Sequence, residues 1–311
     1  MVIFTGLDSV EATPEGRVVA IGVFDGVHIG HQSIIGEAVA AATECSARAT
    51  AVTFHPHPEA VLRPRSAPRA LTPPERKAQL LGALGVEEVV TVEFDQEFAR
   101  LTPESFCRAV LLDSLGTRVV YVGDNFHFGH DGVGTPADLA FYGKNHGFAV
   151  RTVALVKDAE GPVSSTRIRE ALRAGDVARA AILLGRPHRV SGPVSEGVGR
   201  GRTLGAPTAN IQVGRDVALP RMGVYATRAV SRDGTWHRAV TSVGTNPTFE
   251  TGRQVRVETL LLGFVGDLYG SILAIDFIEH IRGQKAFPDV EGLREQIARD
   301  VQAAEAIHES L

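Results

Sequence analysis

The sequence predicts an α/β unit with a doubly wound parallel sheet, followed by an antiparallel β-barrel with a terminal helix. Strands and helices alternate from about residue 17 to residue 185, as in a parallel sheet with helical crossovers. After Gly185-Arg186-Pro187, short alternating apolar segments are separated by glycine and proline turns, which is typical of antiparallel barrels. A chain of 311 residues accommodates about two domains. We expect the boundary between residues 185 and 186.

Composition excludes several classes of protein. The chain is 44% hydrophobic and 22% charged, as in ordinary soluble proteins, and its net charge of -4 gives no electrostatic case for nucleic acid or an anionic membrane as partner. No run approaches the ~20 apolar residues of a membrane span, and the N-terminus lacks the pattern of a signal peptide. Cys45 and Cys107 have no paired spacing, which predicts buried free thiols without a disulfide or zinc site. We therefore expect a cytoplasmic protein, and composition leaves a homo-oligomer open.

The first unit is predicted to hold five strand–helix pairs. The expected strands are 17–24, 49–54, 88–94, 118–123 and 149–156, and the expected helices are 31–47, 72–84, 102–115, 136–146 and 165–174, with a short helix at 175–184. Thr72-Pro73-Pro74-Glu75 predicts a capping box, and Thr102-Pro103 predicts a second cap followed by proline. Ligands of such sheets bind beyond the carboxyl ends of the strands, which is where the polar candidates cluster.

The central stretch is Gly22-Val23-Phe24-Asp25-Gly26-Val27-His28-Ile29-Gly30-His31, between the first predicted strand and its helix. A glycine-rich turn lets the backbone approach a phosphate, and a helix N-terminus offers free N–H groups and a positive dipole end. His28 and His31 are three residues apart, so both imidazoles can face one anion. A plain tight turn with surface histidines is the alternative, which the paired spacing makes less attractive.

Three further loops follow predicted strands. In the first, prolines force His55 and His57 into an extended loop, where they are placed to line a pocket; a metal site is the alternative, but no third ligand has suitable spacing. In the second, Asn125 offers an amide to a ribose or phosphate, or is a turn residue, while Phe126 and Phe128 are placed to pack against an aromatic ring. In the third, the hydroxyl-rich Ser164-Ser165-Thr166 begins a helix, either as a plain cap or, with Arg169, as an anion site.

The second unit is predicted to contain six strands and one helix. The expected strands are 188–196, 208–213, 223–230, 237–243, 254–264 and 271–278, and the helix 289–307 carries an apolar stripe of Val290, Leu293, Ile297 and Val301. Gly197 to Asn210 is glycine-rich without a Walker A sequence, so it predicts either a hairpin connection or a loop that wraps phosphates. Thr208 and Asn210 lie two apart on one face of a strand and suit Mg²⁺ and a phosphate oxygen.

Glu258 lies in the apolar strand segment Val255-Arg256-Val257-Glu258-Thr259-Leu260. A carboxylate there needs either a partner or a function. One interpretation is a general base beside a substrate hydroxyl, and the other is an ion pair with Arg256 or Arg253 on the outer face.

These motifs resemble, in order, those of the bacterial bifunctional riboflavin kinase/FMN adenylyltransferases, also called FAD synthetases. The Gly22–His31 stretch resembles the HxGH signature of nucleotidyltransferases, Ser164-Ser165-Thr166-Arg167-Ile168-Arg169 the ISSTxxR motif, and Pro207-Thr208-Ala209-Asn210 the riboflavin kinase signature. Asn246-Pro247-Thr248-Phe249, Val257-Glu258 and Asp267-Leu268-Tyr269-Gly270 follow the kinase order. The resemblance implies that the chain makes FMN from riboflavin and FAD from FMN, using MgATP in both steps.

The resemblance also implies site residues. Catalysis is assigned to His28, His31 and Glu258. The adenylyltransferase ATP site is assigned to Gly22, Phe24, Asp25, Gly26, Asn125, Ser165, Thr166 and Arg169, with Arg167 facing solvent. The kinase ATP site is assigned to Gly199, Gly201, Arg202, Gly205, Thr208 and Asn210, the last two also holding Mg²⁺. Flavin contacts are assigned to His57, Phe126, Phe128, Arg282 and Phe287.

The sequence departs from the family pattern at His55, His130, Gly263 and Gln284. These departures leave open an enzyme that retains only one of the two activities. A non-catalytic flavin or nucleotide sensor with the same folds is the other alternative. Retention of both histidines, Glu258 and the Thr208/Asn210 pair favours catalysis, because a sensor needs no general base.

Overall fold

The computed structural model describes residues 1–195, 208–245, 255–287 and 289–311. The chain divides into two compact units, Met1–Ser164 and Ser165–Leu311. The predicted combination of a parallel sheet and an antiparallel barrel is confirmed. The functional boundary at residue 185 stays a prediction.

The first unit is built on a six-stranded sheet in the order β1-β4-β3-β2-β5-β6, with all neighbours parallel. The strands are β1 (Val2–Thr5), β2 (Arg17–Ile21), β3 (Arg48–His55), β4 (Glu88–Glu93), β5 (Thr117–Gly123) and β6 (Ala149–Val153). The five predicted strands are present, and β1 is an addition that pairs with β4 at the edge. Strand order reverses at β2, because β3 and β4 follow on one side of it and β5 and β6 on the other.

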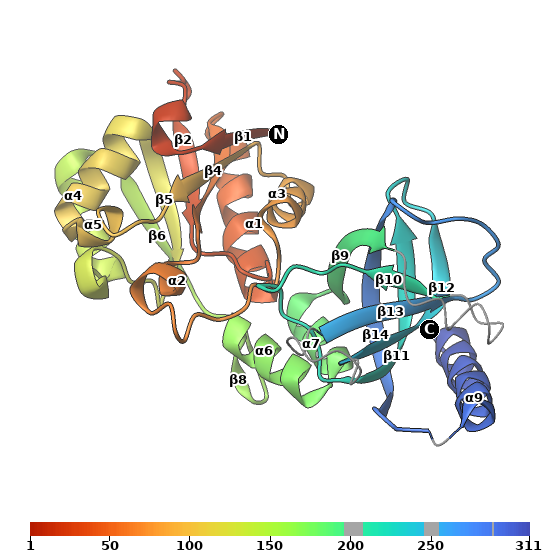
Figure 1. Cartoon of the computed structure of the whole chain (residues 1–311). Helices are drawn as coiled ribbons and strands as arrows, with labels where there is room; N and C mark the ends of the chain where they lie inside the picture. Colours follow the sequence, from red (N-terminus) through yellow and green to blue (C-terminus); the bar gives the residue numbers. More distant parts are fainter. Residues whose placement is uncertain (196–207, 246–254, 288) are drawn as a thin grey trace. The chain divides into compact units, whose positions relative to one another are not determined.

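Helices cover both faces of this sheet (Figure 1). They are α1 (Ile29–Glu44), α2 (Pro58–Leu62), α3 (Pro74–Ala83), α4 (Pro103–Phe106) continuing as the π-helical η3 (Cys107–Ser114), and α5 (Pro136–His146). Single turns and a hairpin complete the unit: η1 (Leu7–Ser9), η2 (Phe98–Arg100), η4 (His130–Gly132), β7 (Lys157–Asp158) and β8 (Gly161–Pro162).

The two predicted helix caps have different outcomes. The Thr102 side chain accepts from the N–H of Ser105 at 3.1 Å, so this cap is confirmed. The Thr72 capping box is wrong: α3 begins at Pro74 with Pro73 at the N-cap and no side-chain cap. Its physical reason is a competing contact, since the Thr72 N–H donates to the buried Asp25 carboxylate at 3.1 Å.

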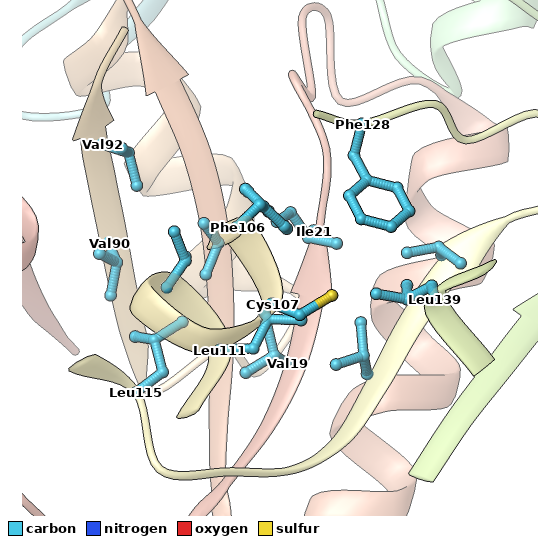
Figure 2. Packing of buried hydrophobic residues seen from close by; sticks show 14 of the residues in the cluster. Val19, Ile21, Val90, Val92, Phe106, Cys107, Leu111, Leu115, Phe128 and Leu139 are labelled. Atoms are coloured by element: carbon cyan, nitrogen blue, oxygen red, sulfur yellow. The ribbon is translucent and has the colours of Figure 1, made fainter. Parts of the chain in front are cut away.

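Burial on both faces explains the continuous apolar strands of the sheet. Along β2, Val18 and Ala20 pack on the side of α1, whereas Val19 and Ile21 pack on the side of α4 and η3. Figure 2 shows the second of these cores, in which the labelled side chains are Val19, Ile21, Val90, Val92, Phe106, Cys107, Leu111, Leu115, Phe128 and Leu139. The carboxyl ends of β2, β3 and β5 therefore lie side by side on a rigid support.

The second unit is a closed antiparallel barrel in the order β10-β13-β12-β11-β14-β9. The strands are β9 (His188–Ser195), β10 (Ala209–Ile211), β11 (Gly223–Ser231), β12 (Trp236–Thr245), β13 (Val255–Leu261) and β14 (Ile272–Gly283). β14 is longer than predicted, because its pairing with β11 continues to Gly223 opposite Gly283. Two helices precede the barrel, α6 (Ser165–Ala174) and α7 (Val177–Leu184), and α7 packs on β14 and β9.

The terminal helix α9 (Val290–Glu309) packs on the outer face of the barrel against β11 and β12 (Figure 1). Asp289 caps it by accepting from the N–H of Gly292 at 2.8 Å, as the predicted start requires. Its most buried apolar residue is Ala304, packed with Val224 and Val240. The predicted stripe is wrong at Val290, which is 62% exposed because it lies in the first turn, before the helix reaches the barrel.

The two cysteines also differ from each other. Cys107 is fully buried, and burial raises the pKa of its thiol to about 12. Cys45 is only partly buried at the C-cap of α1, so the expectation of a buried thiol is wrong there. The helix ends before it, and its thiol donates to the carbonyl of Ala41.

Candidate functional site

The loop between β2 and α1 has an unusual backbone. Phe24 and Val27 adopt positive φ angles of 50° and 41°, and Gly26 one of 86°. A β-branched residue such as Val27 rarely takes this conformation, which marks strained backbone of the kind found at functional sites. At Gly22 a Cβ would lie 3.0 Å from the Phe24 ring, so a larger residue there would displace the ring by a few tenths of an ångström.

His28 and His31 come together at the start of α1, as predicted. His28 is the N-cap, and its Nδ1 accepts from the N–H of His31 at 3.3 Å. The two rings stack with centroids 3.5 Å apart and an interplanar angle of 18°. Because Nδ1 accepts that bond, the ring proton of neutral His28 is at Nε2. The edge of Phe24 packs against the His31 ring at 5.3 Å.

Asp25 points into the protein. It is 4% exposed, and its carboxylate accepts from the N–H of Leu71 at 3.0 and 3.1 Å and from that of Thr72 at 3.1 Å. The segment before α3 is thereby tied to the loop. Asp25 was predicted to be an ATP-site residue. Its carboxylate binds backbone N–H groups, so its contacts in the described structure stabilise the loop.

The loops after β3 and β5 lie at the same edge of the sheet. His57 caps α2, with its Nδ1 accepting from the N–H of Glu59 at 3.1 Å, and His55 is exposed at the end of β3. Asn125 is exposed in the loop after β5. Phe126 is partly buried and stacks on the buried Phe128 with centroids 5.7 Å apart. Phe128 thus belongs to the hydrophobic core, and Phe126 is the ring that reaches the surface.

The hydroxyl-rich motif begins a helix, as predicted, and that helix belongs to the second compact unit. Ser165 is the first residue of α6, Thr166 is exposed, and Arg169 is 6% exposed. Arg167 is partly buried, so the expectation that it faces solvent is met only in part.

In the barrel, strand register aligns the kinase candidates. Asn210 of β10 is directly opposite Glu258 of β13, and Ser242 of β12 is opposite Glu258 on its other side. Directly opposed side chains share one face, with Cβ atoms about 4.5–5.5 Å apart. Ala209 is buried while Thr208 and Asn210 are only partly so, as expected for two residues on one face. The Glu258 carboxylate has no ion-pair partner in the described residues, Arg256 included, whereas Arg253 lies outside them.

The predicted flavin end of the barrel lies where β14 meets α9. The Arg282 guanidinium donates to both oxygens of Asp300 at 2.8 and 2.7 Å, and it lies 5.9 Å from the Phe287 ring. The Lys285 ammonium lies 5.8 Å from the centroid of the same Phe287 ring. Arg282 therefore holds α9 and Phe287 together.

Three of the four departures from the family pattern have local explanations. Gly263 has a positive φ of 68°, which favours glycine. The Gln284 amide donates to the Ser242 hydroxyl at 3.1 Å and to the Val243 carbonyl at 3.0 Å. The ring of His130 lies 3.2 Å from the carbonyl of Ala99. The sequence analysis did not identify Ser242, Asp300 or Lys77. These residues belong to no recognisable motif, and only the tertiary fold brings them close to the candidate residues.

Several predicted residues lie outside the described part of the chain. They are Gly199, Gly201, Arg202 and Gly205, together with Asn246-Pro247-Thr248-Phe249. Within the described ranges, no group of three or more His, Cys, Asp or Glu side chains is arranged to hold a metal ion. None of the described helices has the length and apolar character needed to cross a membrane.

Two family models match the chain. One, described as FAD synthetase, covers residues 10–167, and the other, described as riboflavin kinase, covers residues 184–308. A solved structure described as a macrolide-efflux protein from Streptococcus pneumoniae is 32% identical, with a TM-score of 0.89, covering 98% of this chain and 99% of that one. Its fold is therefore similar to this chain over almost its whole length.

Curated relatives match over nearly their full length. The protein from Pseudomonas fluorescens is 38% identical over 99% of this chain and 98% of its own. The one from Listeria monocytogenes is 36% identical over 97% and 95%, and the one from Escherichia coli K12 is 34% identical over 96% of each. All three are called bifunctional riboflavin kinase/FMN adenylyltransferase. With both family models matched in order along one chain, this protein belongs to the family of bifunctional riboflavin kinase/FMN adenylyltransferases.

Proposed function

We propose that this chain phosphorylates riboflavin to FMN in its barrel and adenylylates FMN to FAD in its α/β domain, with ATP as co-substrate in both steps. The observation that supports the proposal is the local placement of the candidate residues on the described strands and helices. The paired histidines begin a helix at the carboxyl edge of a parallel sheet. Glu258 of β13 is paired directly opposite Asn210 of β10. We assign the two activities to residues 1–185 and 186–311.

In the adenylylation step, an oxygen of the FMN phosphate attacks the α-phosphorus of ATP, and pyrophosphate leaves. No protein nucleophile is required, so orientation and charge stabilisation carry the catalysis. His28 donates from Nε2, because its Nδ1 is engaged by the N–H of His31. His31 stacks beside it and adds a second donor to the same anion. Gly22, Phe24, Asp25 and Gly26 form the loop that leads into the N-terminus of α1, whose positive dipole end favours the triphosphate.

Asn125, Ser165, Thr166 and Arg169 complete the triphosphate site in this proposal. Support comes from the local structure of the motif, in which Ser165 is the first residue of α6 and Arg169 is buried on the same helix. His57, Phe126 and Phe128 are assigned to the flavin side, with Phe126 as the ring that reaches the surface.

In the kinase step, the ribityl 5′-hydroxyl of riboflavin attacks the γ-phosphorus of ATP, Glu258 accepts the hydroxyl proton, and ADP leaves. Thr208 and Asn210 offer hydroxyl and amide oxygens, the hard ligands that suit Mg²⁺ when substrate phosphates and water supply the rest. When bound, Mg²⁺ neutralises charge on the phosphates. Gly199, Gly201, Arg202 and Gly205 are assigned to the ATP phosphates, and Arg282 and Phe287 to the flavin.

Substitution of one residue in each site tests the assignment. His28→Ala is expected to abolish FAD formation from FMN and to leave FMN formation from riboflavin intact. Glu258→Ala is expected to do the reverse, because each residue serves one reaction only. Both are measured by chromatography of flavins with purified full-length chain. If neither substitution affects its reaction, the site assignment is wrong.

Two outcomes of the same assay would favour the alternatives. Loss of one activity in the unsubstituted chain would indicate that only one is retained. Binding of flavin and ATP without turnover would indicate a sensor. A homo-oligomer and a cytoplasmic location stay predictions, which light scattering of the purified chain and fractionation of cells test.

A further inference from the structure

A buried lysine lies beneath the β2–α1 loop. Lys77, on α3, is 9% exposed, and its ammonium donates to the carbonyl of Val23 at 2.8 Å and to the hydroxyl of Thr53 at 3.1 Å. The Thr53 hydroxyl in turn donates to the same Val23 carbonyl at 2.9 Å. Burial lowers the pKa of Lys77, and the negative charge of Asp25 acts against that shift. Two donors from different elements thus converge on one carbonyl of the loop.

The residues that follow Val23 need such anchoring. Phe24 and Val27 have positive φ angles, a conformation that persists in non-glycine residues only when surrounding contacts hold it. Each part of the loop has its own anchor. Lys77 holds Val23, the Asp25 carboxylate is held by backbone N–H groups, and Gln32 donates to the Val27 carbonyl at 2.9 Å.

The anchor at Val23 has a short connection to the histidines. Val23 precedes Phe24, whose ring packs edge-on against His31 at 5.3 Å, and His31 stacks on His28 at 3.5 Å. A shift of the Val23 peptide would therefore move Phe24 and remove the side support of His31. Packing alone does not require a cation at this position, because an apolar side chain of similar length fills the same space at lower desolvation cost.

We propose that Lys77 is a positioning residue for the adenylylation of FMN: its ammonium, together with the Thr53 hydroxyl, holds the Val23 carbonyl so that Phe24 keeps His31 and His28 in their stacked arrangement. The inference rests on the proposed assignment of His28 and His31 to that reaction. Lys77 touches neither the histidines nor, in this proposal, the substrates, and it acts through the loop.

Full-length Lys77→Met, which keeps the length of the side chain and removes the donor, is the first test. Its kcat for conversion of FMN to FAD is expected to fall about 10²-fold, the effect of misplacing groups by roughly 1 Å. KM for FMN and for ATP should change much less, and riboflavin phosphorylation by the same preparation should be unchanged. A rise in KM with unchanged kcat would overturn the proposal, as would an unchanged kcat in folded protein.

A matched pair of variants guards against a general loss of stability. Thr53→Val removes the hydroxyl that contacts Lys77 and Val23, whereas Thr50→Val makes the same change on the same strand, where the hydroxyl contacts Glu88 at 3.0 Å instead. Both threonines are 2% exposed. Thr53→Val should lower the adenylylation kcat and Thr50→Val should not. If Lys77→Met fails to fold, this pair decides, and equal effects of the two variants would refute the proposal.

His28→Ala, measured in parallel, separates this inference from the assignment on which it rests. Loss of FAD formation in His28→Ala with a full rate in Lys77→Met would refute only the role of Lys77. Full rates in both would refute the site assignment itself, and the proposal with it.

Discussion

The buried ion pair between Arg282 and Asp300 predicts an asymmetric response to mutation. Asp300 is 3% exposed and accepts from Arg282 at 2.8 and 2.7 Å and from Gln296 at 2.9 Å. Among the described residues, Arg282→Ala leaves Gln296 as the one side-chain donor to this buried carboxylate, so the expected loss of unfolding free energy is about 3–5 kcal/mol. Asp300→Ala leaves a guanidinium whose side chain is 22% exposed. Because water and the Gly283 carbonyl still solvate it, the expected loss is only about 1–3 kcal/mol.

Urea unfolding followed by tryptophan fluorescence measures both values. The chain has one tryptophan, Trp236, which begins β12 in the barrel unit and has the Arg228 guanidinium 5.1 Å from its ring. The control is Arg299→Ala, which breaks an exposed pair with Glu295 on the same helix and should change stability by less than about 1 kcal/mol. Equal losses for Arg282→Ala and Asp300→Ala, or a greater loss for Asp300→Ala, would refute this reasoning.

Three further predictions concern single residues. Burial lowers the pKa of His308, so the unfolded chain binds a proton at this residue more readily than the folded chain. The stability of the barrel should therefore fall as the pH drops below about 6.5. His308→Gln should reduce this dependence of stability on pH in urea titrations, and an unaltered dependence would contradict the prediction. At Gly192 a Cβ would lie 2.0 Å from the backbone carbonyl oxygen of Gln212, so Gly192→Ala should cost about 1–3 kcal/mol in the same assay, and unchanged stability would count against this close approach. Cys107 is fully buried with a pKa near 12, so a thiol reagent should modify Cys45 first in the native chain; equal rates would argue against this packing.

The arrangement of strands and helices was predictable because its signals are local. An apolar run such as residues 88–94 is recognisable in the sequence because both faces of the strand are buried, Val90 and Val92 in one core and Val89 in the other. β1 escaped prediction because it is only four residues long, and Val2 and Ile3 are exposed at the sheet edge. Its strand character depends on pairing with β4, more than 80 residues away in sequence.

The candidate site divides in the same way. His28 and His31 were predictable, because helical spacing alone brings residues three apart together. The role of Asp25 was not, since its carboxylate binds the N–H of Leu71, 46 positions away. Likewise, the pairing of Glu258 with Asn210 and Ser242 depends on the register of three strands. A one-residue shift in register would turn these side chains to opposite faces.

Whether one chain carries both reactions is decided by a time course of riboflavin with excess MgATP and purified protein. Flavins are separated by chromatography at each time point. We expect riboflavin to be converted to FMN, and FMN then to decline as FAD and pyrophosphate appear. Failure of either step would contradict it: riboflavin left unchanged, or FMN that accumulates without any FAD.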